Sequence, residues 1–360
     1  MLHQLALGFT PYIGPVSTKA LIRHCGTAEA VFRASSGQLL GIPGIHQRIV
    51  SGLKDPVIMK RAEEELKFIE RHQVEVLFYG DRDYPGRLMN CCDAPPLLYY
   101  KGTADLNAPR LVAIVGTRKM TSYGQRLCEQ LVADLGGYGV VTISGLAYGV
   151  DAAVHRTSVL QGIPTVGVLG HGLDTLYPRS HLDLSRKMAC AGGLLTEFPT
   201  GTLPDRSNFP MRNRIIAGMA DAVVVVEASK KGGALITADL ANSYSRDVFA
   251  FPGRASDEFS EGCNFLIKSN RAALISSAAD LIQALNWGSK EQVCATQISL
   301  PLALTDEERL VTECLSEGPL SVDALCCHLN MPQSRLSVLL LNLELQGILI
   351  ALPGKSYRLA

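Results

Sequence analysis

The middle of the chain, about residues 74–286, alternates short apolar runs with helical segments, and this alternation constrains the fold most strongly. Continuous apolar strands separated by helices of about 12–15 residues are typical of a parallel sheet covered on both faces. We therefore expect an α/β fold, a Rossmann-like, doubly wound and mostly parallel sheet whose ligands lie at the carboxyl ends of the strands. The expected strands are 74–79, 111–116, 140–144, 165–169, 193–198, 222–227, 248–251 and 273–276.

Residues 1–70 are expected to form a helical, SAM-like or helix-hairpin-helix-like domain. Glycines punctuate apolar helical stretches at 12–22 and 39–50. Such a turn can hold a phosphate at the start of its second helix, with Lys19 and Arg48 as accessory cations. It can also simply let two helices reverse direction, and the sequence leaves both interpretations open.

The rest of the chain divides into three parts. A Rossmann-like domain is expected over 71–287, followed by a linker over 288–304 that has no sustained periodicity. Residues 305–360 then show three helical segments and a terminal hairpin, which is a winged-helix pattern. The first of these helices opens with a T-x-x-E capping box at Thr305.

Charge and composition restrict the classes of function. Lys+Arg and Asp+Glu both number 34, so a polyanion would have to be bound by a few placed cations rather than by overall positive charge. The ten cysteines include no C-x-x-C pair, and no Cys/His cluster has ligand spacing. We expect free thiols in a reducing cytoplasm and no metal site. No apolar stretch approaches the roughly 20 residues of a membrane span, so no membrane contact is expected.

The turn after the strand at 111–116 lacks a dinucleotide fingerprint. A G-x-G-x-x-G turn lets the backbone approach a pyrophosphate, but this chain reads Gly116-Thr117-Arg118-Lys119. A second G-x-G at 170–172 lacks the third glycine, so no nicotinamide or flavin cofactor is expected. Arg118 instead indicates a phosphate, held by its side chain and by amides of the helix that starts near Thr121. The alternative is a surface arginine paired with a local carboxylate.

The helix expected after 207 carries two arginines in an unfavourable place. Arg212 and Arg214 lie near the positive end of the helix dipole, where each cation costs about 0.3–1 kcal/mol. An anionic ligand would offset that cost. Pairing with Asp205 or Glu227 is the alternative.

Two further strand ends are rich in glycine. The stretch 144–155 places glycines after a strand, and Asp151 and His155 then lie four residues apart on one helix. We expect a structural hydrogen bond there rather than an acid/base pair, because no nucleophile accompanies them. The stretch 228–238 has a Gly-Gly step beside Lys230 and Lys231 that can present amides to a phosphate. Such turns along one sheet edge, with a further one at Gly172, predict an elongated anionic ligand.

At these residues the sequence resembles the DNA-processing protein A family (DprA/Smf), closely over about 75–286. The flanking segments agree with the family's SAM-like and winged-helix domains. Two departures are Gly232-Gly233-Ala234, where the family commonly has Ser-Gly-Ser, and Ser269-Asn270-Arg271, where it has a glycine. The matching motifs are G-T-R-K-M-T-S-Y-G, S-G-L-A-Y-G-V-D-A-A-V-H, L-G-H-G-L-D-T-L-Y-P, F-P-M-R-N-R-I-I-A-G, G-G-A-L-I-T-A, F-P-G-R and E-G-C-N-F-L-I.

The resemblance implies a protein that binds single-stranded DNA without catalysing a reaction on it. It also implies a homodimer through the Rossmann-like domain and a role in natural transformation. In that role the protein would deliver RecA onto the strand in place of single-strand-binding protein, which is a further candidate partner. No catalytic residue is assigned. The candidate DNA-binding residues are Gly116, Thr117, Arg118, Lys119, Ser144, Gly145, Gly172, Asn208, Arg212, Asn213, Arg214, Lys231, Gly232 and Gly233. Because few aromatics accompany these cations (Tyr123, Tyr148, Phe209), base stacking is expected to be a minor term.

Two other classes of function compete with this one. A nucleotide-hydrolysing enzyme resembling the lysine-decarboxylase-like phosphoribohydrolases would carry a Gly-Gly-x-Gly-Thr-x-x-Glu signature, from which Gly232-Gly233-Ala234 departs. Release of the base from AMP-like nucleotides would identify such an enzyme. A purely structural α/β scaffold would show no salt-dependent binding to oligonucleotides.

The winged helix is expected to contribute little to DNA binding. Its presumed recognition helix, 332–346, carries one cation, Arg335, whereas a helix that enters a major groove normally brings several Arg, Lys or Asn side chains. Deleting residues 300–360 should therefore leave most of the affinity for single strands, measured by titration of a labelled oligonucleotide. A loss of more than about tenfold would contradict this expectation.

Overall fold

The computed structural model describes residues 1–288, 305–315, 318, 320–329, 331–345, 348–352 and 356–359. The chain forms two compact units, Met1–Val293 and Cys294–Ala360. The linker expected over 288–304 lies, apart from Gly288, outside the described residues.

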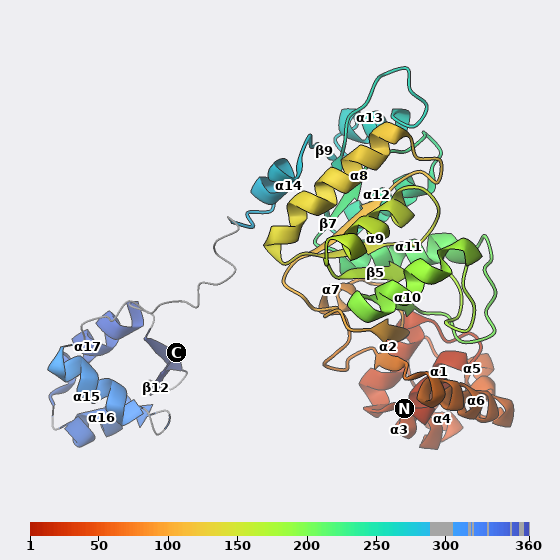
Figure 1. Cartoon of the computed structure of the whole chain (residues 1–360). Helices are drawn as coiled ribbons and strands as arrows, with labels where there is room; N and C mark the ends of the chain where they lie inside the picture. The colour runs from red at the N-terminus through yellow and green to blue at the C-terminus, as the bar shows by residue number, and fades with distance from the viewer. Residues whose placement is uncertain are drawn as a thin grey trace. The chain divides into compact units, whose positions relative to one another are not determined.

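A nine-stranded sheet forms the centre of the first unit (Figure 1). Its order is β1-β2-β6-β5-β4-β3-β7-β8-β9, and the run from β6 to β9 is parallel throughout, which confirms the doubly wound, mostly parallel fold. From β3 the chain proceeds outward through β4, β5 and β6, then returns to β7 on the other side of β3. This reversal makes a topological switch point at β3, the place where open α/β sheets bind ligands. The strands are β1 (Glu75–Phe78), β2 (Leu97–Gly102), β3 (Leu111–Val115), β4 (Val141–Ser144), β5 (Thr165–Val168), β6 (Gly193–Thr196), β7 (Ala222–Val225), β8 (Asp247–Ala250) and β9 (Ala273–Leu274).

Strand β2 was not expected from the sequence. It pairs antiparallel with both β1 and β6, so it inserts between the first strand and the parallel part of the sheet. The expected pattern was strand and long helix in alternation, and β2 follows only the short helix α7 (Gly86–Met89). An antiparallel neighbour needs no long crossover helix, and that is why the alternation does not signal it.

Helices cover both faces of the sheet (Figure 1). One apolar layer joins α8 (Ser122–Leu135), α9 (Val150–Leu160) and α14 (Ala278–Ala284) to β3, β7 and β8. The opposite layer joins α7, α11 (Asn208–Met219), α12 (Gly233–Ser243) and α13 (Glu261–Lys268) to the other side of the same strands. Helix α10 (Leu182–Ala191) packs against β2, β5, β6 and α9, and short 3₁₀ turns lie at Gly136–Tyr138 and Arg179–His181.

The N-terminal helices form a separate apolar core at one end of the sheet. Buried side chains of these helices pack with Phe78 of β1 and with Leu97 and Tyr99 of β2. The strand missed from the sequence is therefore one of the two strands that pack against the helical part. The helices are α1 (Leu2–Phe9), α2 (Pro15–Cys25), α3 (Ala28–Arg33), α4 (Ser36–Leu40), α5 (Gln47–Leu53) and α6 (Pro56–His72).

A polar clamp connects α6 to the loop that follows β6. The Glu65 side chain is only 1% exposed, and its carboxylate accepts hydrogen bonds from the backbone N–H of Thr200 (3.0 Å) and from the Thr200 hydroxyl. Arg61 pairs with Glu65 at 2.7 Å and donates to the Thr200 carbonyl at 2.8 Å. Since this loop leads directly into α11, the N-terminal helices help to position the start of that helix.

The second unit is a winged helix of three helices and a three-stranded sheet in the order β10-β12-β11. The expected capping box is confirmed: Thr305 accepts from the backbone N–H of Glu308, and Glu308 from that of Thr305. The only cation on α17, Arg335, is paired with Glu307, while Val338 and Leu341 are exposed on the same helix. The elements are α15 (Asp306–Cys314), β10 (Leu320–Ser321), α16 (Val322–Leu329), α17 (Gln333–Leu345), β11 (Leu349–Leu352) and β12 (Ser356–Leu359).

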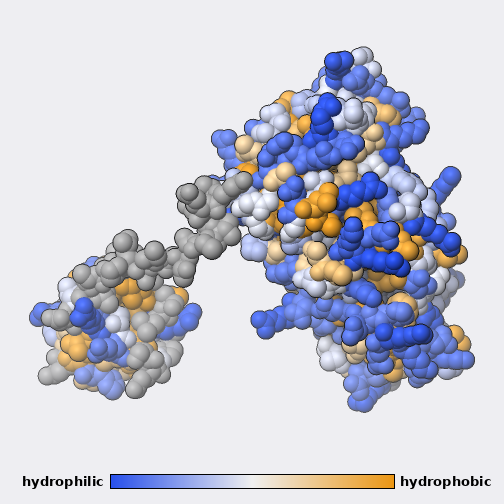
Figure 2. Space-filling model, viewed as in Figure 1, coloured by the Kyte–Doolittle hydropathy of each residue, from blue (hydrophilic) through white to orange (hydrophobic). Residues whose placement is uncertain are grey.

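The surface is mostly hydrophilic on the face that Figure 2 shows, and its hydrophobic groups gather in small patches. None of the helices in the described part of the chain is long and apolar enough to span a bilayer.

The Glu65 clamp gives a test of how the N-terminal helices support the sheet. Replacing Glu65 by Ala removes an acceptor for two donors of Thr200 and leaves the Arg61 guanidinium unpaired. We expect the free energy of unfolding to fall by about 1–3 kcal/mol in chemical denaturation. Glu64→Ala is the matched control, because Glu64 is exposed on the same helix. Equal stability of the two variants would show that the clamp contributes nothing.

Candidate nucleic-acid interface

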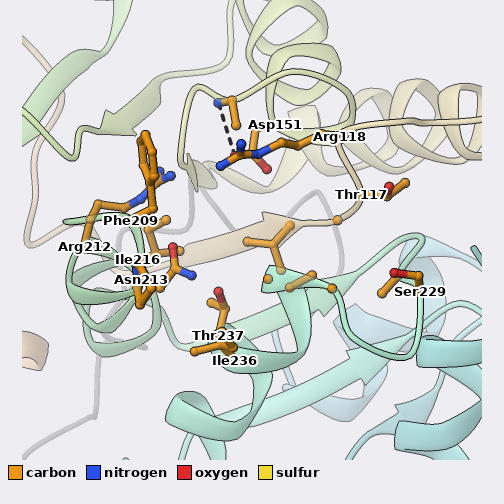
Figure 3. A pocket seen from close by; sticks show the side chains of 18 of the residues that line it. Thr117, Arg118, Asp151, Phe209, Arg212, Asn213, Ile216, Ser229, Ile236 and Thr237 are labelled. Atoms are coloured by element: carbon orange, nitrogen blue, oxygen red, sulfur yellow. Dashed lines mark hydrogen bonds between the residues drawn. The ribbon is translucent and has the colours of Figure 1, made fainter. Parts of the chain in front are cut away.

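A cavity of about 550 Å³ opens at the topological switch point, where β3, β4 and β7 end. Three arginines and one carboxylate contribute the charged groups of its lining, so the cavity is positive. Apolar groups of α11 and α12 form part of its wall (Figure 3). The lining residues are Val115, Gly116, Thr117, Arg118, Ala147, Asp151, Arg206, Phe209, Pro210, Arg212, Asn213, Ile216, Ala228, Ser229, Gly232, Gly233, Ala234, Ile236 and Thr237.

The turn after β3 places Arg118 at the edge of this cavity. Its backbone is tied to both neighbours, because the Thr117 N–H donates to the Glu227 carbonyl (2.7 Å) and the Thr117 carbonyl accepts from the Val150 N–H (3.2 Å). The Arg118 side chain is exposed, and its guanidinium carbon lies 5.2 Å from the centre of the Phe209 ring. No carboxylate within the described residues forms an ion pair with Arg118. Its charge is therefore available to a ligand.

Arg212 of α11 lies beneath the strand ends and is only 4% exposed. Its Nη1 donates to the Val168 carbonyl at 2.8 Å, whereas Nε is buried without a hydrogen-bond partner among the described residues. Burial lowers the pKa of Arg212 to about 10; Asp151 opposes this shift and Arg118 adds to it. Arg212 thus remains charged at neutral pH, and it lies close enough to Arg118 for the two cations to repel each other. An anion between them would relieve that repulsion.

Gly145 provides the space that Arg212 occupies. A Cβ at this position would lie 1.7 Å from the Arg212 Nη1, which no side chain could accommodate. Gly145 is itself buried. The absence of a side chain at Gly145 therefore leaves room for the arginine.

Asp151 and His155 each make a hydrogen bond within the fold, in line with the expectation from the sequence. The Asp151 carboxylate accepts from the Ala147 N–H at 3.3 Å (Figure 3), and the His155 Nδ1 is 2.7 Å from the Thr165 hydroxyl oxygen. Burial raises the pKa of Asp151, against the opposing effect of Arg212, and burial lowers the pKa of His155 to about 3. His155 is fully buried, so it has no access to a ligand in the cavity.

The far wall of the cavity comes from the segment between β7 and α12. Gly232 is the N-cap of α12 and Gly233 its first residue, so the expected Gly-Gly step does precede a helix. Ser229 lies opposite Arg212 and Phe209, and Thr237 of α12 lies beside Ile236 (Figure 3). Hydroxyl groups thus line the wall where Gly232-Gly233-Ala234 departs from Ser-Gly-Ser.

The start of α8 differs from expectation. The Thr121 N–H donates to a Glu227 carboxylate oxygen at 2.9 Å, and the Thr121 hydroxyl donates to the other oxygen. The same hydroxyl oxygen accepts from the Gly124 N–H as the helix cap. Because Glu227 already provides a negative charge at this helix start, these amides are not open to a phosphate.

The predicted site residues separate into three groups. Seven line the cavity together: Gly116, Thr117, Arg118, Arg212, Asn213, Gly232 and Gly233. Lys119 and Lys231 are exposed next to lining residues. The remaining five, Ser144, Gly145, Gly172, Asn208 and Arg214, are not among the lining residues.

Hydrogen bonds and packing explain why these five do not reach the cavity surface. Ser144 is buried and donates to the Ile114 carbonyl at 2.7 Å, and the Asn208 amide donates to the Gly170 carbonyl at 3.1 Å. Gly172 is buried, and a Cβ there would lie 2.4 Å from the Pro199 carbonyl oxygen.

Arg214 pairs with Glu197, and both are largely buried. The partners suggested from the sequence, Asp205 and Glu227, are occupied elsewhere, by Ser207 and Thr121 respectively. Arg214 follows Arg212 by two residues, which is about 200° around a helix, so the two point to different sides of α11.

Sequence reasoning missed Arg206, Ser229 and Thr237 as lining residues. Arg206 precedes the motif that drew attention to α11, and Ser229 and Thr237 flank the Gly-Gly step. Their position within a few residues of a recognised motif is the sequence signal that would have identified these three residues.

Comparison with known proteins agrees with this architecture. Residues 75–286 match the family described as DNA recombination-mediator protein A, and residues 298–355 match the DprA winged helix domain. Protein Smf from Synechocystis sp. is 31% identical over an alignment of 383 positions, which covers 96% of this chain and 95% of that protein.

Two solved structures of relatives are similar to the chain. DNA processing protein A from Streptococcus pneumoniae, an X-ray structure, has a TM-score of 0.65 at 30% identity and covers 79% of this chain and 97% of its own. DNA processing protein A from Helicobacter pylori, studied for its single-stranded DNA binding mode, has a TM-score of 0.54 at 29% identity, covering 59% of this chain and 96% of its own. The motifs, the fold and these matches together show that this chain belongs to the DNA recombination-mediator protein A (DprA/Smf) family.

Proposed function

We propose that this protein is a non-catalytic recombination mediator that binds single-stranded DNA, protects the incoming strand and loads RecA onto it in natural transformation. The observation that carries the proposal is the convergence of Arg118, Arg206 and Arg212 on one open cavity at the switch point of the sheet. Arginine side chains bind phosphate with charge-assisted hydrogen bonds. Membership of the family, and the single-stranded DNA binding studied in the Helicobacter pylori relative, support DNA as the source of that phosphate.

The charge distribution also favours a polymer over a free nucleotide. The cavity is open, and two exposed lysines are next to its lining residues in the sequence: Lys119 follows Arg118, and Lys231 precedes Gly232. Cations therefore continue beyond the space that one phosphate would fill. The whole chain has no net charge, so affinity comes from this local concentration of cations.

A homodimer through the Rossmann-like domain is part of the proposal, with RecA and single-strand-binding protein as further partners. The edge strand β9 supports the dimer. Leu274 of β9 is 53% exposed, and Phe265 of the preceding helix α13 is 41% exposed. Exposed apolar groups of this kind are candidate contacts for a second copy of the chain.

Removing Arg118 should weaken binding to single strands of every sequence. Arg118→Ala deletes one phosphate contact, so we expect roughly tenfold weaker binding or more. The slope of log Kobs against log salt should become shallower by about 0.7, the contribution of one phosphate in a single strand. Salt-titrated fluorescence anisotropy with a labelled oligonucleotide measures both quantities. Arg71→Ala, an exposed arginine in the last turn of α6, is the control and should change neither. Unchanged affinity and slope in Arg118→Ala would refute the assignment of the cavity to DNA.

Displacing Arg212 without deleting it provides an independent check. Gly145→Ala places a Cβ where the guanidinium lies, so Arg212 must leave the Val168 carbonyl. We expect weaker binding to single strands and a lower thermal midpoint. In Gly37→Ala the new Cβ meets no atom within 4 Å, and this variant should behave as the wild type. If Gly145→Ala binds DNA as tightly as Gly37→Ala, Arg212 is not required.

A further inference from the structure

The loop between β6 and α11, residues 197–207, carries part of the cavity near its C-terminal end. Arg206 lines the cavity, and Phe209 and Arg212 follow on α11. The backbone of the loop turns at Gly201, whose φ of 80° is in the left-handed region that favours glycine. The position of Arg206 therefore depends on the contacts that hold the middle of the loop.

The middle of the loop is hydrogen-bonded to the segment that starts with the G-x-G turn at 170–172. The Gly201 N–H donates to the Asp174 carboxylate at 3.0 Å, and the Thr202 carbonyl accepts from the Gly172 N–H at 3.1 Å. The first residue of α11 donates from its side-chain amide to a carbonyl of the same turn, also at 3.1 Å. The loop, the turn and the start of α11 thus form one hydrogen-bonded unit.

Thr200, which precedes Gly201, joins this unit to the N-terminal helices. Its N–H donates to Glu65 at 3.0 Å, and its carbonyl accepts from Arg61 at 2.8 Å. Its hydroxyl donates to Glu65 and accepts from Arg61 at 3.0 Å. The Arg61 guanidinium carbon lies 4.9 Å from the centre of the Phe9 ring of α1, so a second N-terminal helix supports the contact. All three polar groups of Thr200 are therefore held by one side chain pair.

We propose that Glu65 and Thr200 are positioning residues for DNA binding, through which the N-terminal helices hold loop 197–207 in the conformation that binds the strand. The inference rests on the proposed function and adds a means of regulating it. Residues 1–72 are all described by the structure, and none of them lines the cavity. Their effect on affinity is therefore indirect.

The size of the effect follows from the population of the binding conformation. When the Glu65 clamp is open, only a fraction of the molecules present the loop correctly, and the apparent affinity falls by that fraction. Coupling of this kind is reciprocal, so a strand bound in the cavity also strengthens the contact between the loop and α6.

Thr200→Val tests the proposal, because it removes the hydroxyl from the clamp and keeps the shape of the side chain. We expect binding to a labelled oligothymidine to weaken about three- to tenfold in fluorescence anisotropy, the effect of one lost hydrogen bond. The slope of log Kobs against log salt should stay as in the wild type, unlike that of Arg118→Ala, because no phosphate contact is lost. Thr200→Ser keeps the hydroxyl and should bind as the wild type does. Thr202→Val is the matched control, since the contact of Thr202 described above uses only its backbone.

Hydrogen exchange measures the reciprocal effect, with each variant assayed well below its thermal midpoint. Saturating oligothymidine should slow amide exchange in α6 of the wild type and of Thr200→Ser, and should do so less in Thr200→Val. A purely structural clamp would lower the thermal midpoint of Thr200→Val but leave its affinity and the response of α6 unchanged, and this result would overturn the proposal. A shallower salt slope in Thr200→Val, or an equal loss of affinity in Thr202→Val, would overturn it as well.

Failure of the proposed function gives a different pattern. In that case the wild type shows no salt-dependent binding to the oligonucleotide, or Arg118→Ala binds as tightly as the wild type, and the positioning role falls with it. Failure of the positioning role alone leaves the effect of Arg118→Ala intact and makes Thr200→Val equal to the wild type.

Discussion

The burial of the Arg212 guanidinium is the interaction on which the site depends. A buried charge must be compensated, and here the Val168 carbonyl and the nearby Asp151 provide part of that compensation. Several features of the surrounding sequence follow from this arrangement. Gly145 has no side chain because the guanidinium occupies its space, and Asp151 is held by the turn that begins α9. The strand ends are thus built around a cation whose Nε has no hydrogen-bond partner among the described residues.

The fold could be predicted from the sequence because its parallel strands are buried on both faces. Such strands must be continuously apolar, and the helices between them must be long enough to cross the sheet, so both leave a clear pattern. Strand β2 left no such pattern. It is antiparallel and follows a helix of only four residues, yet together with β1 it packs against the N-terminal helices.

The site was predictable where backbone geometry determines it and less so where side-chain direction does. Gly116, Thr117 and Arg118 are the first three residues after β3, so their place at the carboxyl edge follows from the topology. Arg212 and Arg214 look equivalent in the sequence, but two residues of helix turn them to different sides, and only Arg212 reaches the cavity. Tyr177 could not be recognised as a neighbour of α11, because Phe209, whose ring centre lies 6.0 Å from that of Tyr177, is on another segment.

The carboxylate of Glu227 distinguishes two helix starts near the switch point. A helix start presents free backbone amides unless something occupies them. Glu227 is only 3% exposed and accepts from the N-cap amide of α8, at Thr121. The N-cap of α12 is Gly232, and no side chain caps that helix. The first helix start is therefore already joined to a buried carboxylate of the next-door strand end, whereas the second keeps its backbone amides free of side-chain caps.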